Sequence, residues 1–169
     1  MTVDLGGHGD SEGDLYELSL RDHLNDAVAA FDRVASEDGV DQSRVGVCGA
    51  SYGGYLAGQL VRKRPASRLF LRAPALYDDA AFDVPMRERS QSSVPQAAGF
   101  LGGLASYRGA IMVLEGGKDE VVSHDTIERY LAAAPRANHQ VIPDATHELS
   151  RAEWNDVFVE AVIDWFRPR

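Results

Sequence analysis

The feature that most constrains the fold of this chain is the pentapeptide GASYG at residues 49–53. A short β-branched run, RVGVC at residues 44–48, precedes it, and a helix-like stretch follows it. A serine between two glycines in this setting predicts a sharp turn from a strand into a helix, which lifts the serine hydroxyl out of the sheet. We expect the residues two before and two after Ser51 to be small because the strand and the helix pass close to each other there. Ser51 is therefore a candidate nucleophile at the end of a strand.

Strand-like and helix-like segments alternate along the chain with short connections. This alternation predicts an α/β fold with three layers, α/β/α, around a mostly parallel sheet. About five strands are expected, at residues 2–5, 45–48, 68–71, 110–114 and 139–142. Helices are expected from Ser19, where Asp22 completes a capping box, and at residues 52–64, 126–134 and 154–166. The apolar stripe of the last helix is interpreted as core packing rather than as a ligand site.

One stretch breaks this rhythm. Residues 77–108 contain scattered aspartates, prolines and glycines with weak periodicity. An insertion of this length in an α/β domain is typically a lid or a binding loop. We therefore predict a single domain over residues 1–169, with residues 77–108 as a lid or binding-loop insertion.

The composition excludes some classes of partner. The formal net charge is -9, which argues against nucleic acid and anionic membranes as partners. The single cysteine, Cys48, excludes an internal disulfide, and we expect it to be a small buried residue of the strand. A signal peptide and a long apolar run are both missing from the sequence, so a cytoplasmic location is expected.

The remaining chemistry follows from what a serine nucleophile needs. A histidine must take the hydroxyl proton, and a carboxylate must orient that histidine. Hydrolases with this kind of nucleophile turn use the chain order serine, acid, histidine. Asp119 and His147 each lie just past the end of a predicted strand, where parallel α/β sheets place their sites. We therefore predict that Ser51, Asp119 and His147 form a catalytic triad.

Other residues of the chain could fill some of these roles. Glu115 and Glu120 are the alternative acids. Structural roles are favoured for three further histidines: His8, which is also a candidate oxyanion or metal residue, His124 and His139. A fourth, His23, is expected to be solvated on an amphipathic helix. No histidine, cysteine and carboxylate cluster has metal-ligand spacing, and the glycine-rich residues 6–9 complete no nucleotide-binding motif, so neither metal nor cofactor is expected.

Three segments together resemble the α/β-hydrolase superfamily. Residues 49–55, GASYGGY, resemble the nucleophile elbow of prolyl-oligopeptidase-type and dienelactone-hydrolase-like members. The segments around Asp119 and His147 resemble the acid and base loops, and residues 5–11, LGGHGDS, resemble the turn after the fourth strand. The resemblance implies a serine esterase that acts on a small-molecule ester through an acyl-enzyme. A peptidase or amidase of the prolyl-oligopeptidase type is the alternative.

The same resemblance implies a truncated fold. The first strand-like segment of this chain matches the fourth strand of the family sheet, and the loop after the third strand normally supplies one oxyanion amide. The Tyr52 backbone amide is then the one oxyanion donor expected from this chain. Residues 45–47 would lack their usual neighbouring strand, so a homodimer that covers this edge is expected. A catalytically impaired fragment with a non-enzymatic role is the alternative from another class.

Overall fold

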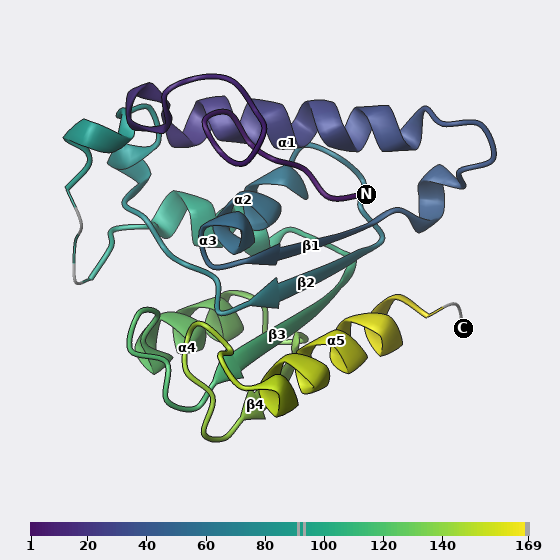
Figure 1. Cartoon of the computed structure of the whole chain (residues 1–169), viewed down its shortest axis with the longest axis vertical. Helices are drawn as coiled ribbons and strands as arrows, with labels where there is room; N and C mark the ends of the chain where they lie inside the picture. The colour runs from purple at the N-terminus through teal and green to yellow at the C-terminus, as the bar shows by residue number, and fades with distance from the viewer. Residues whose placement is uncertain (91, 93, 168–169) are drawn as a thin grey trace.

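The computed structural model describes residues 1–90, 92 and 94–167. Within this part of the chain, one sheet contains the strands β1 (Gly46–Ala50), β2 (Arg68–Arg72), β3 (Ala110–Gly116) and β4 (Asn138–Ile142) in that spatial order. All three neighbouring pairs are parallel, so the carboxyl ends of the strands share one end of the sheet. The prediction of an α/β fold with a parallel sheet is confirmed (Figure 1).

Helices cover both faces of this sheet. The described helices are α1 (Leu20–Ala35), α2 (Tyr52–Leu60), α3 (Ala98–Ala105), α4 (His124–Ala133) and α5 (Ala152–Phe166). Short 3-10 turns lie at Leu15–Glu17, Gln42–Arg44, Asp79–Ala81 and Met86–Glu88. The larger core cluster joins one face of the sheet to α1, α2, α3 and α4, and a smaller cluster joins the other face to α5. The three predicted layers are therefore present.

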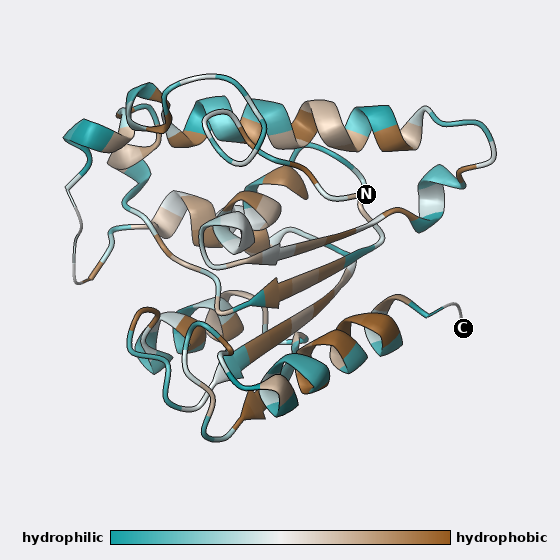
Figure 2. Ribbon diagram, in the orientation of Figure 1, coloured by the Kyte–Doolittle hydropathy of each residue, from teal (hydrophilic) through white to brown (hydrophobic). Residues whose placement is uncertain are grey.

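Alternation along the strands explains why the core has two parts. Leu69 and Leu71 of β2 face the larger cluster, whereas Phe70 between them packs in the cluster that α5 covers. A strand buried on both faces reads as a continuous apolar run, as β2 and β3 do (Figure 2). The apolar residues of α5, including Trp154 and Phe158, pack on this second face, as predicted.

The start of α1 follows its sequence signal. Ser19 is the N-cap and accepts a hydrogen bond from the backbone of Asp22, while the Asp22 carboxylate accepts one from the Ser19 backbone. The predicted capping box is confirmed.

The expected strand at residues 2–5 is wrong, so the sheet has four described strands rather than about five. Val3 is exposed, and only Leu5 of this segment packs against the core. The chain then turns at once through Gly7 and Gly9, whose φ angles are 70° and 50°. A strand needs a partner for its backbone, and within the described residues the outer edge of β1 has none.

Cys48 is exposed rather than buried, which corrects its predicted environment. It is the register partner of Phe70, but α5 packs over β2, β3 and β4. The end of α5 reaches β1 at Gly46, where Phe166 fills the space that a side chain would need.

The segment predicted as an insertion is partly a structural element. Its helix α3 buries Phe100, whose ring lies 4.7 Å from that of Tyr55 and 5.6 Å from that of Tyr130. The rest of the segment, before α3, connects β2 to this core helix. No helix in the described part of the chain is both long and apolar enough to cross a bilayer.

Candidate active site

Ser51 occupies the predicted turn between β1 and α2. Its φ and ψ angles are 49° and -118°, a strained conformation for a residue with a side chain. Four backbone hydrogen bonds hold it there. The Ser51 amide donates to the Arg72 carbonyl at 2.9 Å, and the Ser51 carbonyl accepts from the amides of Gly54 and Ala75, both at 3.0 Å, and of Tyr55 at 3.2 Å. The end of β2 therefore supports the strained turn.

The glycines around Ser51 have different steric roles. A Cβ on Gly49 would lie 2.2 Å from the Gly53 carbonyl oxygen, and one on Gly54 would lie 2.9 Å from the Pro74 Cα. A Cβ on Gly53 would meet nothing within 4 Å. The close passage of strand and helix thus requires glycine at positions 49 and 54, and the expectation of a steric need at position 53 is wrong.

The structure brings Ser51, His147 and Asp119 together. The Nε2 atom of His147 lies 3.0 Å from the Ser51 Oγ, and its Nδ1 atom lies 2.8 Å from the Asp119 Oδ2. A carboxylate accepts, so Nδ1 carries the proton and Nε2 is left free to accept the serine proton. This is the hydrogen-bond arrangement that activates a serine hydroxyl.

The Asp119 side chain, only 4% exposed, has a defined orientation. Its Oδ1 accepts hydrogen bonds from the backbone amides of Val121 and Val122 at 2.9 and 2.8 Å, which leaves Oδ2 for His147. The acid and base loops are also joined, because the Lys118 amide donates to the Ala145 carbonyl at 2.9 Å.

Arg72 connects the base loop to the sheet. Its Nη1 donates to the His147 carbonyl at 2.5 Å from the carboxyl end of β2. Burial lowers the pKa of Arg72, and the nearby carboxylates of Asp119 and Glu148 oppose that shift. Arginine stays protonated in proteins, so the guanidinium is a cation that ties the histidine loop to the strand beside the elbow.

Tyr52 is the first residue of α2, so its backbone N–H has no acceptor inside the helix. The partial positive charge of the helix N-terminus lies at the same place. This amide is the oxyanion donor that the sequence predicts, and that role stays a prediction.

The Tyr52 side chain belongs to a buried network that the sequence did not reveal. Its hydroxyl is hydrogen-bonded to Nδ1 of His23, and Nε2 of His23 lies 3.0 Å from the Gly6 carbonyl oxygen. Since a carbonyl only accepts, Nε2 carries the proton and Nδ1 accepts from the tyrosine. Burial lowers the pKa of His23, and burial raises the pKa of Tyr52 to about 12, so both groups are neutral at pH 7.

The expectation that His23 is solvated is wrong, because the residue is completely buried. The signal was present in the sequence. His23 falls three residues after Leu20 and directly before Leu24, on the buried face of α1. Such a position is where a helix contacts its neighbours, so His23 could have been assigned to the core.

The alternative acids have other surroundings. Glu115 is buried, with its carboxylate 3.1 Å from Nδ1 of His124 and 3.6 Å from Nε2 of His139, and Glu120 is exposed. Hydrogen bonding to Glu115 raises the pKa of His124. His8 lies near the elbow, where its Nδ1 is 3.3 Å from the Gly6 carbonyl oxygen. Among the described residues, none of these five hydrogen-bonds to the Ser51 side chain, whose hydrogen-bond partner is His147.

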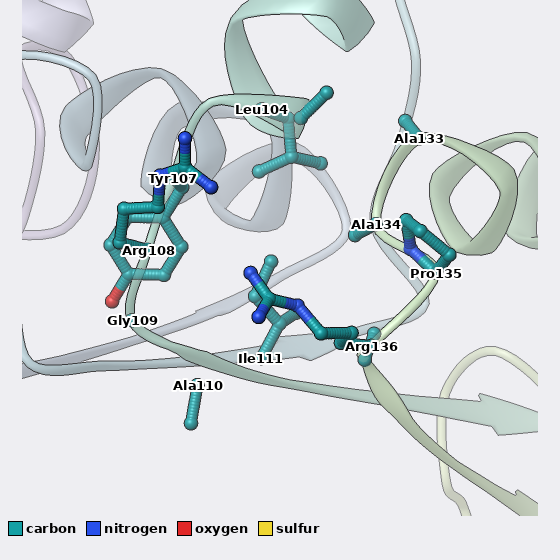
Figure 3. Close-up of a pocket in the computed structure, with 12 residues that line it drawn as sticks. Leu104, Tyr107, Arg108, Gly109, Ala110, Ile111, Ala133, Ala134, Pro135 and Arg136 are labelled. Atoms are coloured by element: carbon teal, nitrogen blue, oxygen red, sulfur yellow. The ribbon is translucent and has the colours of Figure 1, made fainter.

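A separate hollow of about 320 Å³ lies at the opposite end of the sheet (Figure 3). Its lining includes Leu104, Ile111 and Pro135, with the side chains of Arg108 and Arg136 beside them. It lies at the start of β3, whereas the three predicted catalytic residues follow the carboxyl ends of their strands. This hollow is therefore separate from the Ser51 site.

Residues 10–74 match the prolyl oligopeptidase family. An uncharacterized protein of Mycobacterium tuberculosis is 29% identical over 153 residues, which cover 87% of this chain and 52% of that protein. The chain thus spans about half the length of the curated relatives it matches.

Solved structures show the same fold. The ferulic-acid-bound Est1E of Butyrivibrio proteoclasticus is similar with a TM-score of 0.74 and 16% identity, over 96% of this chain and 75% of that one. Dipeptidyl peptidase 4 of Porphyromonas gingivalis is similar with a TM-score of 0.69 and 17% identity, over 89% of this chain and 23% of that one. The chain therefore has the α/β-hydrolase fold, with four strands in the described part of its sheet.

Proposed function

We propose that this chain is a serine hydrolase that cleaves carboxylic esters through an acyl-enzyme. The observation that carries the proposal is the hydrogen-bonded series from Ser51 Oγ to His147 at 3.0 Å and from His147 to Asp119 at 2.8 Å. The series is built on a strained turn at the carboxyl end of a parallel sheet, where ligands of such folds bind.

The reaction follows from these positions. His147 Nε2 takes the proton as Ser51 Oγ attacks the ester carbonyl carbon, and the carbonyl oxygen becomes an oxyanion. The Tyr52 N–H donates to this oxyanion. The tetrahedral intermediate then expels the alcohol, which receives the proton from His147, and leaves an acyl group on Ser51. A water molecule repeats the sequence, with His147 again as base and then as acid, to release the carboxylic acid.

Asp119 would hold His147 in the required tautomer and stabilise the imidazolium that forms in each step. Tyr52 supplies one oxyanion donor, and no second donor is identified among the described residues. Losing one such donor costs roughly 10²–10³ in turnover in well-studied serine hydrolases. We therefore expect slow turnover from this chain.

Labelling with a fluorophosphonate probe tests the proposal, because the probe reacts only with an activated serine. Wild type should be labelled and should hydrolyse 4-nitrophenyl acetate, and Ser51→Ala should do neither. Ser106→Ala, at an exposed serine of the same chain, is the matched control and should behave as wild type. Absence of labelling in folded wild type would refute the proposal and favour a non-enzymatic fragment.

A peptidase or amidase is the second candidate. The match of residues 10–74 to the prolyl oligopeptidase family favours it. Comparing 4-nitrophenyl esters with 4-nitroanilides of the same acyl group separates the two activities. Faster release from the anilide would replace the esterase assignment with the peptidase one.

A further inference from the structure

Within the described residues, Arg89 is a cation without a carboxylate partner, and it lies over the ring of Tyr52 in the elbow. It follows the 3-10 turn Met86–Glu88, and its guanidinium carbon lies 5.4 Å from the ring centre of Tyr77 and 5.9 Å from that of Tyr52. Its Nε and Nη2 atoms are buried, and among the described residues neither has a hydrogen-bond acceptor. Two donors of a permanent cation are thus withdrawn from water and left unused.

Neighbouring arginines behave differently. Arg87 pairs with Glu17, and Arg21 pairs with Asp83. The chain carries 26 acidic and 17 basic residues, so carboxylates are abundant. Nevertheless, no ion pair of Arg89 occurs in the part of the chain that the structure describes.

The two tyrosine rings only partly compensate for this isolation. A cation over an aromatic face is attracted by the ring, but the ring accepts no in-plane hydrogen bond from the guanidinium edge. Buried donors without acceptors are costly. The planar fork of an arginine matches a carboxylate in a bidentate arrangement, so that is the group best able to use these donors.

The two rings beside this fork are connected to the nucleophile turn along the backbone. Tyr52 directly follows Ser51, and Tyr77 lies two residues after Ala75, whose amide donates to the Ser51 carbonyl at 3.0 Å. The rings of Tyr52 and Tyr77 are themselves 5.9 Å apart. Arg89 therefore lies over one ring that follows the nucleophile directly and over another from the segment that is hydrogen-bonded to the nucleophile turn.

We propose that Arg89 is a substrate-binding residue that recognises a carboxylate on the acyl part of the ester. The substrate class is then a monoester of a dicarboxylic acid. This proposal rests on the proposed function, and it gives the segment before α3 a role in specificity.

Paired substrates test the proposal. The variant Arg89→Gln should lower kcat/KM about 10- to 100-fold for mono-4-nitrophenyl glutarate, because a charge-assisted hydrogen bond is lost. It should change kcat/KM for the neutral 4-nitrophenyl butyrate less than about threefold. Arg87→Gln, which changes an exposed arginine two residues away, is the matched control and should leave both values near wild type.

Two results would overturn the proposal. Equal losses for both esters would show that Arg89 only supports the fold of the site. An unchanged value for the anionic ester would show that Arg89 does not contact the carboxylate.

A binding measurement keeps this proposal separate from the proposed function. Calorimetric titration of the Ser51→Ala variant with glutarate does not depend on turnover. Binding that is lost in the Ser51→Ala, Arg89→Gln double variant would support the carboxylate site even if no ester were hydrolysed. Absence of binding to the single variant would refute the site even if wild type were an active esterase.

Discussion

Substituting Gly49 and Gly53 separately tests how the elbow is built. In Gly49→Ala, the new methyl group would lie 2.2 Å from the Gly53 carbonyl oxygen and 2.9 Å from the Ala57 Cβ. Both distances are well inside van der Waals contact, so β1 and α2 must move apart. Overpacking of this kind costs about 1–3 kcal/mol. At roughly 2–4 °C per kcal/mol for a domain of this size, Tm should fall by about 2–12 °C.

Gly53→Ala should have the opposite effect. Its methyl group meets nothing within 4 Å, and position 53 lies in the first turn of α2. Replacing glycine by alanine at a compatible site stabilises by about 0.4–1 kcal/mol, chiefly because the unfolded chain loses freedom. A rise in Tm of about 1–4 °C is expected.

Calorimetry and fluorophosphonate labelling of both variants check the steric argument. Gly49→Ala should also be labelled more slowly than wild type, because Ser51 is displaced from His147. A Gly49→Ala protein as stable as wild type, or a Gly53→Ala protein destabilised by more than about 1 kcal/mol, would refute the assignment of the close contact to position 49.

Two further predictions concern pH and association. Burial lowers the pKa of His23 in the folded state. Its contribution to stability is therefore present above the unfolded pKa, near 6.5, and is lost as the pH falls below that value. The free energy of unfolding, measured with urea, should therefore fall more between pH 7.5 and pH 5.5 in wild type than in His23→Gln, by at most about 1.4 kcal/mol per pH unit. An equal fall in both proteins would contradict the buried neutral state of His23. His124→Gln is the control, because the pH dependence expected from His124 has the opposite sign. Its pKa is raised in the folded state, so its contribution to stability is present at low pH and is lost as the pH rises. We also propose that the open edge of β1 pairs with a second copy of this chain. Light scattering at high micromolar concentration should show a dimer that Cys48→Lys weakens, and a strictly monomeric wild type would contradict the pairing.

The predicted catalytic residues could be located from sequence because each lies next to a local signal. Ser51, Asp119 and His147 all follow strand-like runs, and parallel strands bring their carboxyl ends together. No distance information was needed to expect their proximity. The start of α1 was equally predictable, because a capping box involves residues only three positions apart.

The errors concern features that depend on distant neighbours. Whether residues 2–5 form a strand depends on a backbone partner, and whether Cys48 is buried depends on how far α5 extends across the sheet. Arg89 could not be placed because its segment has weak periodicity and its aromatic contacts lie 37 and 12 residues away along the chain. Local patterns carry no information on such contacts.

The residues before β1 still contribute to the elbow, although they form no strand. The strain at Ser51 costs about 1–3 kcal/mol, and four backbone hydrogen bonds of about 0.5–1.5 kcal/mol each offset it. Those bonds hold the backbone, while the bond from Tyr52 to His23 and the bond from His23 to Gly6 hold the neighbouring side chain. The glycine turn at residues 6–9 is thereby linked to the residue that follows the nucleophile. We infer that this glycine turn orders the Tyr52 side chain. Arg89, from the segment between β2 and α3, lies over the ring of the same tyrosine. The environment of Ser51 thus depends on two segments outside the sheet as well as on the ends of its strands.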